Sequence, residues 1–142
     1  MKNIAVICFL LVAGFNASAT IVEAPKTDLK IESAFLDIKT MDVYLEVMTS
    51  HCDQLASPHI VQDARDPRIL HLTAVAHKAF GSCIQMVEER TQTVNLPTLI
   101  EKAHIQISKD ATYSVQFSGM ESDLIVPGHN LIITTQPLVS VQ

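Results

Sequence analysis

Two cysteines are the residues of this sequence whose chemistry is easiest to specify. Cys52 and Cys83 lie 31 residues apart, and the third cysteine, Cys8, falls in an N-terminal apolar run. An even pair in an oxidising compartment forms a disulfide by default. In the chain-entropy model, a cross-link closing a loop of this length stabilises a protein by roughly 3–4 kcal/mol. Redox catalysis is not expected, because thiol oxidoreductases hold their two cysteines close together in basic surroundings.

The histidines are spaced in a way that does not predict a metal site. His71 and His77 are six residues apart, which on a helix separates them by about 240° and rules out the i, i+4 pair of a helical zinc site. His51 and His59 flank Cys52, but a cysteine in a disulfide is not a metal ligand. The sequence therefore predicts neither a metal nor a cofactor.

Acidic pairs occur twice, but the sequence gives no sign that either pair faces a cleft. Asp63 and Asp66 flank an expected turn, and Glu88 and Glu89 end an expected helix. General acid–base work needs two carboxylates on one cleft, so we interpret these groups as solvated. There is no Gly-x-Ser-x-Gly nucleophile elbow, and four glycines in the whole chain leave no phosphate-binding loop. We expect a protein that is not an enzyme.

Two short segments are candidate interaction surfaces. Arg65 and Arg68, on either side of Pro67, form the one local basic cluster, which would meet an acidic group of a partner or pair with neighbouring aspartates. The second segment lies between the apolar runs 124–126 and 131–135, and its Pro-Gly centre predicts a tight turn between two strands. Its residues are Pro127, Gly128, His129 and Asn130.

The stretch around this second segment, Asp123–Ile133, resembles the closing segment of lysin-motif domains, which bind peptidoglycan or chitin. The resemblance covers these eleven residues. Such a domain opens with a strand and a Gly-Asp turn some thirty to forty residues earlier, and Thr91–Lys102 has no such turn. The resemblance implies a polysaccharide ligand, and we carry no binding residue over from it.

The N-terminal segment has the three parts of a secretory signal peptide. Lys2 precedes the apolar run Ile4–Phe15, and Asn16–Ala19 ends in small residues. The run is about a dozen residues, whereas a membrane-spanning helix needs roughly twenty. We expect cleavage after Ala19, a secreted or periplasmic protein, and no stable membrane insertion. The sequence does not separate a bacterial periplasm from eukaryotic secretion.

The composition narrows the class of partner. Ten basic residues against fifteen acidic ones give a net charge of −5 with histidine neutral. Nucleic acids and anionic membrane surfaces attract clustered Lys and Arg, so neither is an expected partner. The residues after the signal peptide suffice for one domain.

The elements that must position these residues are predicted to be helical in the first half of the chain. Apolar residues recur at steps of three and four between residues 33 and 56, and again between 67 and 92. The first stripe consists of Ile38, Met41, Leu45, Met48, Cys52 and Leu55. Because Cys52 and Cys83 each lie on an apolar stripe, we expect a disulfide-linked two-helix hairpin that turns near Asp66–Pro67.

The second half of the chain changes period. Tyr113, Val115 and Phe117 alternate with polar residues, which together with the later apolar runs predicts strands within residues 104–141. Residues 20–32 are predicted to be a flexible lead-in. The fold expected for residues 33–142 is therefore a single α+β domain, in which the two-helix hairpin is followed by a small antiparallel β-sheet.

These observations favour an exported, non-enzymatic binding or accessory protein that acts on another envelope or extracellular protein. The alternative is a protein that binds cell-wall polysaccharide or a small ligand. A homodimer through the stripe between Ile38 and Leu55 is a further arrangement that the narrow stripe allows. The sequence does not identify the partner or the biological process.

Overall fold

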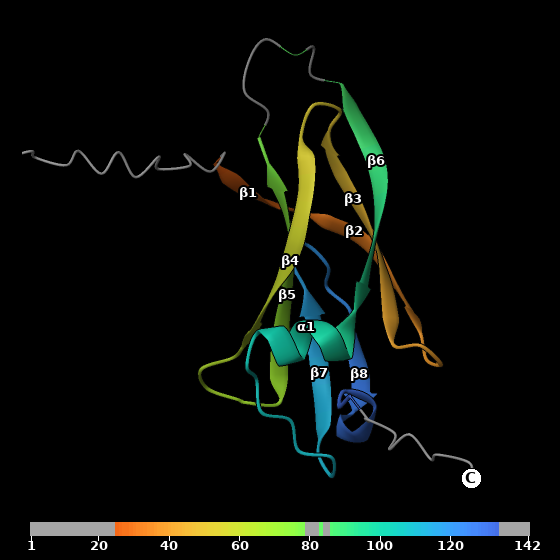
Figure 1. Cartoon of the computed structure of the whole chain (residues 1–142), viewed down its shortest axis with the longest axis vertical. Helices are drawn as coiled ribbons and strands as arrows, with labels where there is room; N and C mark the ends of the chain where they lie inside the picture. The colour runs from red at the N-terminus through yellow and green to blue at the C-terminus, as the bar shows by residue number, and fades with distance from the viewer. Residues whose placement is uncertain (1–24, 79–82, 84–85, 134–142) are drawn as a thin grey trace, which may run out of the picture.

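Strands dominate the computed structural model, which describes residues 25–78, 83 and 86–133 (Figure 1). These residues form eight β-strands, one α-helix of seven residues and one short 3-10 turn. None of the described helices is long and apolar enough to span a membrane. The predicted signal peptide and its cleavage site lie outside the described residues.

Three strands form one antiparallel sheet, here called sheet B. They are β2 (Ile31–Asp37), β3 (Asp42–Ser50) and β6 (Val87–Asn95), in the order β2-β3-β6. The nine residues of β3 and β6 pair without a register shift, whereas β2 has a bulge between Ile31 and Ser33. Strand β3 lies between the other two strands. Its successive side chains point to opposite faces of sheet B and therefore form the middle of each face.

The other five strands form sheet A around β5 (Ile69–His77). Strand β4 (Gln54–Gln62) runs antiparallel along one side of β5. The other side is shared: β1 (Lys26–Leu29) pairs with the second half of β5, and β7 (Thr112–Phe117) runs parallel to the first half. Strand β8 (Asp123–Pro127) pairs antiparallel with β7 and forms an edge.

The chain passes from sheet A to sheet B between β1 and β2. The two strands are separated only by Lys30, and the backbone N–H of Ile31 donates to the carbonyl of Ser118, just after β7. Gly119 follows with φ at +90°, and a Cβ there would lie 2.3 Å from Cγ of Lys30. The positive φ therefore favours glycine at this position, and the Lys30 side chain occupies the space that a Cβ would take.

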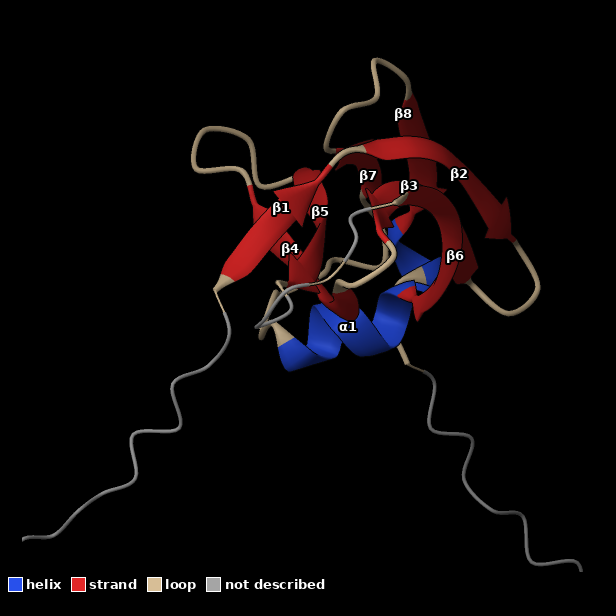
Figure 2. Cartoon of the chain, turned by 90° about the horizontal axis from the view of Figure 1, so that it is seen from above, coloured by secondary structure: helices blue, strands red, loops and turns tan. Residues whose placement is uncertain are grey.

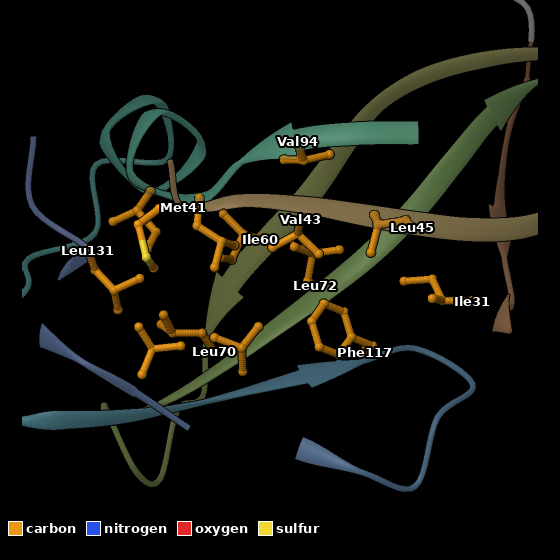
Figure 3. Packing of buried hydrophobic residues seen from close by; sticks show 14 of the residues in the cluster. Ile31, Met41, Val43, Leu45, Ile60, Leu70, Leu72, Val94, Phe117 and Leu131 are labelled. Carbon is orange, nitrogen blue, oxygen red and sulfur yellow. The ribbon is translucent and has the colours of Figure 1, made fainter. Parts of the chain in front are cut away.

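Side chains from both sheets meet in one hydrophobic core (Figure 3). Along β3, Val43, Leu45 and Val47 are buried while the residues between them face outward. The opposing layer comes from β5 and β7, which bury Leu70, Leu72, Val115 and Phe117 among others. Strict alternation on β3 therefore gives sheet B one face in the core and one face in solvent.

Helix α1 (Leu96–Lys102) lies at the side of the molecule where β4 and β6 are the nearest sheet edges (Figure 2). Asn95 caps it, since its Oδ1 accepts from the backbone N–H of Thr98 at 3.1 Å, and Pro97 stands in the first turn. Leu96 and Ile100 are buried. Residues 95–97 therefore form the start of a short helix that contributes to the core.

The predicted two-helix hairpin is wrong. Residues 33–56 form most of β2, all of β3 and the start of β4, and residues 67–92 form β5 and part of β6. The sequence around β3 fits both a helical period and a strand period. Val43, Leu45 and Val47 lie on or beside the helical stripe, and they also occur at every second residue, as in a strand. The strand is the outcome because β3 pairs along its whole length with β6, a partner some forty residues away. The α+β class is replaced by a mostly β fold.

The disulfide between Cys52 and Cys83 is confirmed, with 6.1 Å between the two Cα atoms. It does not join two helices, as the sequence predicts. Cys52 lies in the turn between β3 and β4, and Cys83 lies in the connection between β5 and β6. The chain does reverse at residues 63–68, around Asp66–Pro67, but the reversal joins strands β4 and β5.

The other predicted secondary-structure elements are confirmed in part. Strands β7 and β8 occupy two of the apolar runs predicted to be strands, whereas Ile105 and Ile107 lie in a loop and are partly buried against the core. The expected strand at 131–135 is not formed over its described part, where Leu131 follows a 3-10 turn. The end of that stretch lies outside the described residues. The predicted lead-in includes β1 and the fully buried Ile31.

Candidate interaction surface

The solvent face of sheet B exposes four large apolar side chains, which define the sheet-B patch: Phe35, Tyr44, Met48 and Val87. Phe35 is 67% exposed and Val87 70% exposed, while Met48 and Tyr44 are 40% and 37% exposed. They come from all three strands of the sheet, so the patch crosses the face instead of following one strand. Apolar groups exposed on one face mark a candidate interaction site.

An aromatic pair lies within the patch. Phe35 and Tyr44 are directly opposite each other in the β2–β3 register, and their ring centroids are 6.2 Å apart with the ring planes at 36°. Such tilted aromatic pairs are mutually stabilising. The two side chains are therefore held in place by the strand pairing, which lowers the entropy that a partner must remove on binding.

Polar groups separate the apolar members of the patch. Ser33 donates its hydroxyl proton to the carboxylate of Glu46, and the next residue in the same register row is Thr91 of β6. Glu89 is opposite Met48 in the register, and Thr93 is opposite Tyr44. This mixture of aromatic, aliphatic and hydrogen-bonding groups is typical of the surfaces through which proteins bind one another.

Hydrogen bonds from Arg90 connect β6 to the turn that contains Cys52. Its guanidinium donates to the backbone carbonyls of Asp53 at 2.8 Å and His51 at 2.9 Å, and its Nε donates to Glu88 at 2.5 Å. Hydrogen bonds from Arg90 and then from His51 hold the pKa of Glu88 below its usual value. Glu88 therefore takes part in the contacts that join β6 to this turn.

A second side chain of β6 makes the same kind of contact further along. Nε2 of Gln92 donates to the backbone carbonyl of Ala56 in β4 at 2.7 Å. Side chains of β6 therefore satisfy carbonyls on the edge of sheet A and keep the two sheet edges together. The sequence does not indicate these roles of Arg90 and Gln92, because nothing local in it shows that β4 and β6 are neighbours.

Asp63 organises the loop between β4 and β5. Its carboxylate accepts from the backbone N–H groups of Arg65 and Asp66 at 2.8 and 3.0 Å, and from Nε2 of His71 at 2.9 Å. These hydrogen bonds, with that of His71 the largest, lower the pKa of Asp63 from 3.8 to about 2. Asp66 in turn accepts from the backbone and side chain of Arg68.

The Asp63 carboxylate makes stability depend on pH in a defined direction. Because its folded pKa is lower than its unfolded pKa, its contribution is full above about pH 4 and is lost as the pH falls through about 2. Asp63→Asn is therefore expected to lower the melting temperature at pH 6, with the deficit shrinking between pH 4 and pH 2. Thermal unfolding of both proteins across this range measures it. A deficit that stays constant down to pH 2 contradicts the assignment.

The two segments expected to be interaction surfaces lie at one end of the molecule but do not form one site (Figure 1). The carbonyl of Arg68 accepts from the N–H of Ser114, while the N–H of Gly128 donates to the carbonyl of Ala111. Each segment thus packs beside the first residues of β7. Arg68 forms an ion pair with Asp66. Of the two roles that the sequence allows for this arginine, the structure therefore shows pairing with a neighbouring aspartate.

Gly128, in the expected Pro127–Asn130 turn, has a structural role. Gly128 is buried, and a Cβ on it would lie 2.0 Å from the carbonyl oxygen of Ser108 and 2.8 Å from that of Ala111. These are backbone atoms, so glycine is needed for close packing. Pro127 and His129 flank it, and Leu131 then enters the core.

The solvent face of sheet A has a different character. A shallow hollow of about 370 Å³ is lined largely by polar groups, including His71, Thr73, Gln116 and Asp123. Asp123 accepts from the hydroxyl of Ser114 at 2.9 Å and from Nε2 of Gln116 at 3.3 Å. The aromatic residues of β7, Tyr113 and Phe117, are buried on the other side of the sheet.

Comparisons with protein-family models, with curated proteins and with solved structures find no match for this chain. The segment that resembles lysin-motif domains forms β8, a 3-10 turn and the buried Leu131. Within residues 25–78, 83 and 86–133, no group of three or more His, Cys, Asp or Glu side chains is placed to hold a metal ion. The sheet-B patch is therefore the candidate site that the geometry distinguishes.

Proposed function

We propose that this chain is an exported, non-enzymatic binding protein that contacts another envelope or extracellular protein through the sheet-B patch. The observation that carries the proposal is the exposed aromatic pair Phe35–Tyr44 on the solvent face of sheet B. Tyrosine and other aromatic residues dominate the energetics of protein interfaces. Burial of one large apolar side chain contributes about 1.5–3 kcal/mol.

Export is part of the same proposal. The N-terminal sequence has the parts of a signal peptide, and the Cys52–Cys83 disulfide is of a kind that persists in oxidising compartments. The acidic net charge favours a protein partner over nucleic acid. The protein would therefore act in the periplasm or the extracellular space.

The proposal is tested by affinity capture with tagged, oxidised protein that begins at residue 20. Envelope and secreted fractions from the protein's own source are the input, and bound proteins are identified by mass spectrometry. We expect a partner that is retained at near-equal stoichiometry. The double substitution Phe35→Ser, Tyr44→Ser is expected to weaken its binding on the order of a hundredfold, because it removes about 3 kcal/mol of apolar burial.

A matched variant separates this result from a general loss of surface hydrophobicity. Val61→Ser, Ile125→Ser removes two exposed apolar side chains from the solvent face of sheet A. It is expected to retain the partner with unchanged affinity. Equal capture by both double variants would show that the sheet-B patch is not the binding site.

The rival function is binding of envelope polysaccharide or another polar ligand, and the hollow on sheet A is the observation that favours it. Its hydrogen-bonding groups, Gln116 and Asp123 among them, suit hydroxyl-rich ligands. Sedimentation with purified peptidoglycan is the test. Co-sedimentation that Gln116→Ala abolishes, together with no protein partner in the capture, would replace our proposal with this one.

A further inference from the structure

The charge on the solvent face of sheet B is all of one sign. Side chains of paired strands alternate between the two faces, so the register assigns every second residue of β3 and β6 to this face. The charged residues that share it are Asp37 of β2, Asp42 and Glu46 of β3, and Glu89 of β6. Arg90 is the one basic residue in these three strands, and it lies on the opposite face. Within the three strands, the solvent face therefore has acidic groups and no basic one.

No cationic neighbour balances these acids in the described part of the chain. The carboxylate of Glu46 accepts from the hydroxyl of Ser33, which is a neutral donor. Asp42 accepts from the side-chain amide of Asn95 at 2.9 Å, and Asp37 accepts from a backbone N–H at 2.9 Å. None of the ion pairs between described residues includes any of the four acids. A carboxylate has about four lone-pair sites, so each acid can also accept from a binding partner.

Acidic groups beside this face differ, because they have basic partners. Glu32, at the bulge of β2, pairs with Lys30 at 3.5 Å, and Asp66 in the loop between β4 and β5 pairs with Arg68. Lys39 lies beyond the end of the strands, in the exposed turn between β2 and β3. The uncompensated charge is therefore a property of the face that carries the sheet-B patch.

The aromatic pair lies among these acids. Along β3, Tyr44 has Asp42 and Glu46 as its neighbours on the same face, each about 7 Å away along the strand. Phe35 has Asp37 beside it on β2 in the same way. A carboxylate next to an exposed ring gives a cationic side chain two interactions, since the cation lies over the ring and its N–H groups donate to the carboxylate. Arginine suits such a place best, because its planar guanidinium stacks on aromatic rings.

The geometry points to a basic polypeptide segment as the partner of the sheet-B patch. Its arginine or lysine side chains lie over Phe35 and Tyr44 and pair with the acids beside them, and its apolar side chains contact Met48 and Val87. The inference rests on the proposed function and adds to it the chemistry of the partner. Complementary charge speeds association and disfavours acidic competitors. Binding is therefore expected to weaken as the salt concentration rises.

The test uses two labelled peptides, and fluorescence anisotropy measures their binding to the oxidised protein, residues 20–142. The first peptide is Arg-Ser-Val-Ser-Arg-Ser-Val-Ser-Arg, and the second has Glu in place of Arg. In an extended conformation the first peptide presents Arg and Val on one face, and its arginines recur at the spacing of Asp42 and Glu46. We expect the arginine peptide to bind and the glutamate peptide not to bind.

Glu46→Gln, Glu89→Gln removes two charges from the solvent face of sheet B and keeps the size of both side chains. It is expected to raise the dissociation constant of the arginine peptide about fivefold to tenfold, because each exposed charge pair contributes a modest amount. Glu101→Gln, Glu121→Gln is the matched control, since it removes two charges from exposed positions in α1 and in the loop between β7 and β8. At physiological ionic strength, charges more than about 8 Å apart are largely screened, so the control is expected to change the constant by less than about twofold.

A single charge reversal replaces the double variant if that variant does not fold. Glu89→Lys is then compared with Glu121→Lys, and we expect the first to weaken binding of the arginine peptide more than the second. Equal weakening by test and control variants would show attraction by net charge alone, which overturns the inference. The absence of peptide binding, or equal binding of the two peptides, overturns it as well.

The affinity capture described above separates this inference from the proposed function. A captured partner that is lost with Phe35→Ser, Tyr44→Ser but binds Glu46→Gln, Glu89→Gln with unchanged affinity leaves the proposed function in place and overturns the inference. A capture without any partner that depends on Phe35 and Tyr44 removes the proposed function and this inference with it.

Discussion

Replacing Cys52 and Cys83 together by serine is expected to lower the free energy of unfolding by about 3–4 kcal/mol. The disulfide closes a loop of 31 residues that contains β4 and β5, and without it the unfolded chain gains the freedom that the cross-link removes. The folded state keeps other ties at the same place, because Arg90 binds the carbonyls of His51 and Asp53. The loss therefore arises chiefly in the unfolded state.

Urea unfolding followed by circular dichroism measures this difference. The native protein with a reducing agent should lose the same free energy, and the double variant should not respond to the reducing agent. A loss below about 1 kcal/mol would mean that the cross-link constrains little of the unfolded chain, which would contradict the chain-entropy estimate. Because domains of this size are marginally stable, a loss of the expected size is a large part of the total.

Leu45→Ala is expected to destabilise the protein by about 2–5 kcal/mol, whereas Met48→Ala should change stability by no more than about 0.5 kcal/mol. Leu45 is fully buried between the two sheets (Figure 3), and its truncation leaves a cavity that the packed neighbours cannot fill. Met48 is three residues further along β3 and faces solvent. The strand alternation is the reason for the difference.

This pair of variants also tests the strand against the helix that the periodicity predicts. In a helix, Leu45 and Met48 would lie on one apolar stripe, and both truncations would be costly. In β3 only the first removes core contacts. Chemical denaturation of both variants separates the two cases, and equal losses of several kcal/mol would contradict the strand assignment.

The proposed interaction surface is the solvent face of sheet B. This face carries the aromatic pair Phe35–Tyr44. Sheet A differs, because its solvent face is largely polar around Gln116. Substitutions on the two sheets are therefore informative controls for each other.

Several features follow from the sequence by itself, because their causes are local or chemical. The even pair Cys52 and Cys83 predicts a disulfide whatever the fold around it. Alternation at Tyr113, Val115 and Phe117 predicts strand β7. The proline at position 67 marks a chain reversal, because proline fixes its own φ and removes a backbone donor.

The secondary structure of residues 33–56 and 67–92 was decided only by the tertiary structure. Their apolar residues fit a helical stripe, and Val43, Leu45 and Val47 also fit a strand, so periodicity alone does not choose. The choice comes from partners distant in sequence, such as Thr93 opposite Tyr44, which supply the hydrogen bonds of the strand. A local pattern contains no information on such partners.

The candidate site depends on tertiary structure to the same degree. Phe35 and Tyr44 were expected on a predicted helix, and nothing in their neighbourhood in the sequence indicates that they meet on an exposed sheet face. Their exposure results from the arrangement of two sheets that share one core, with the outward face of sheet B left uncovered by the described residues. The sequence determines which side chains are apolar, and the non-local pairing of the strands determines which of them face solvent.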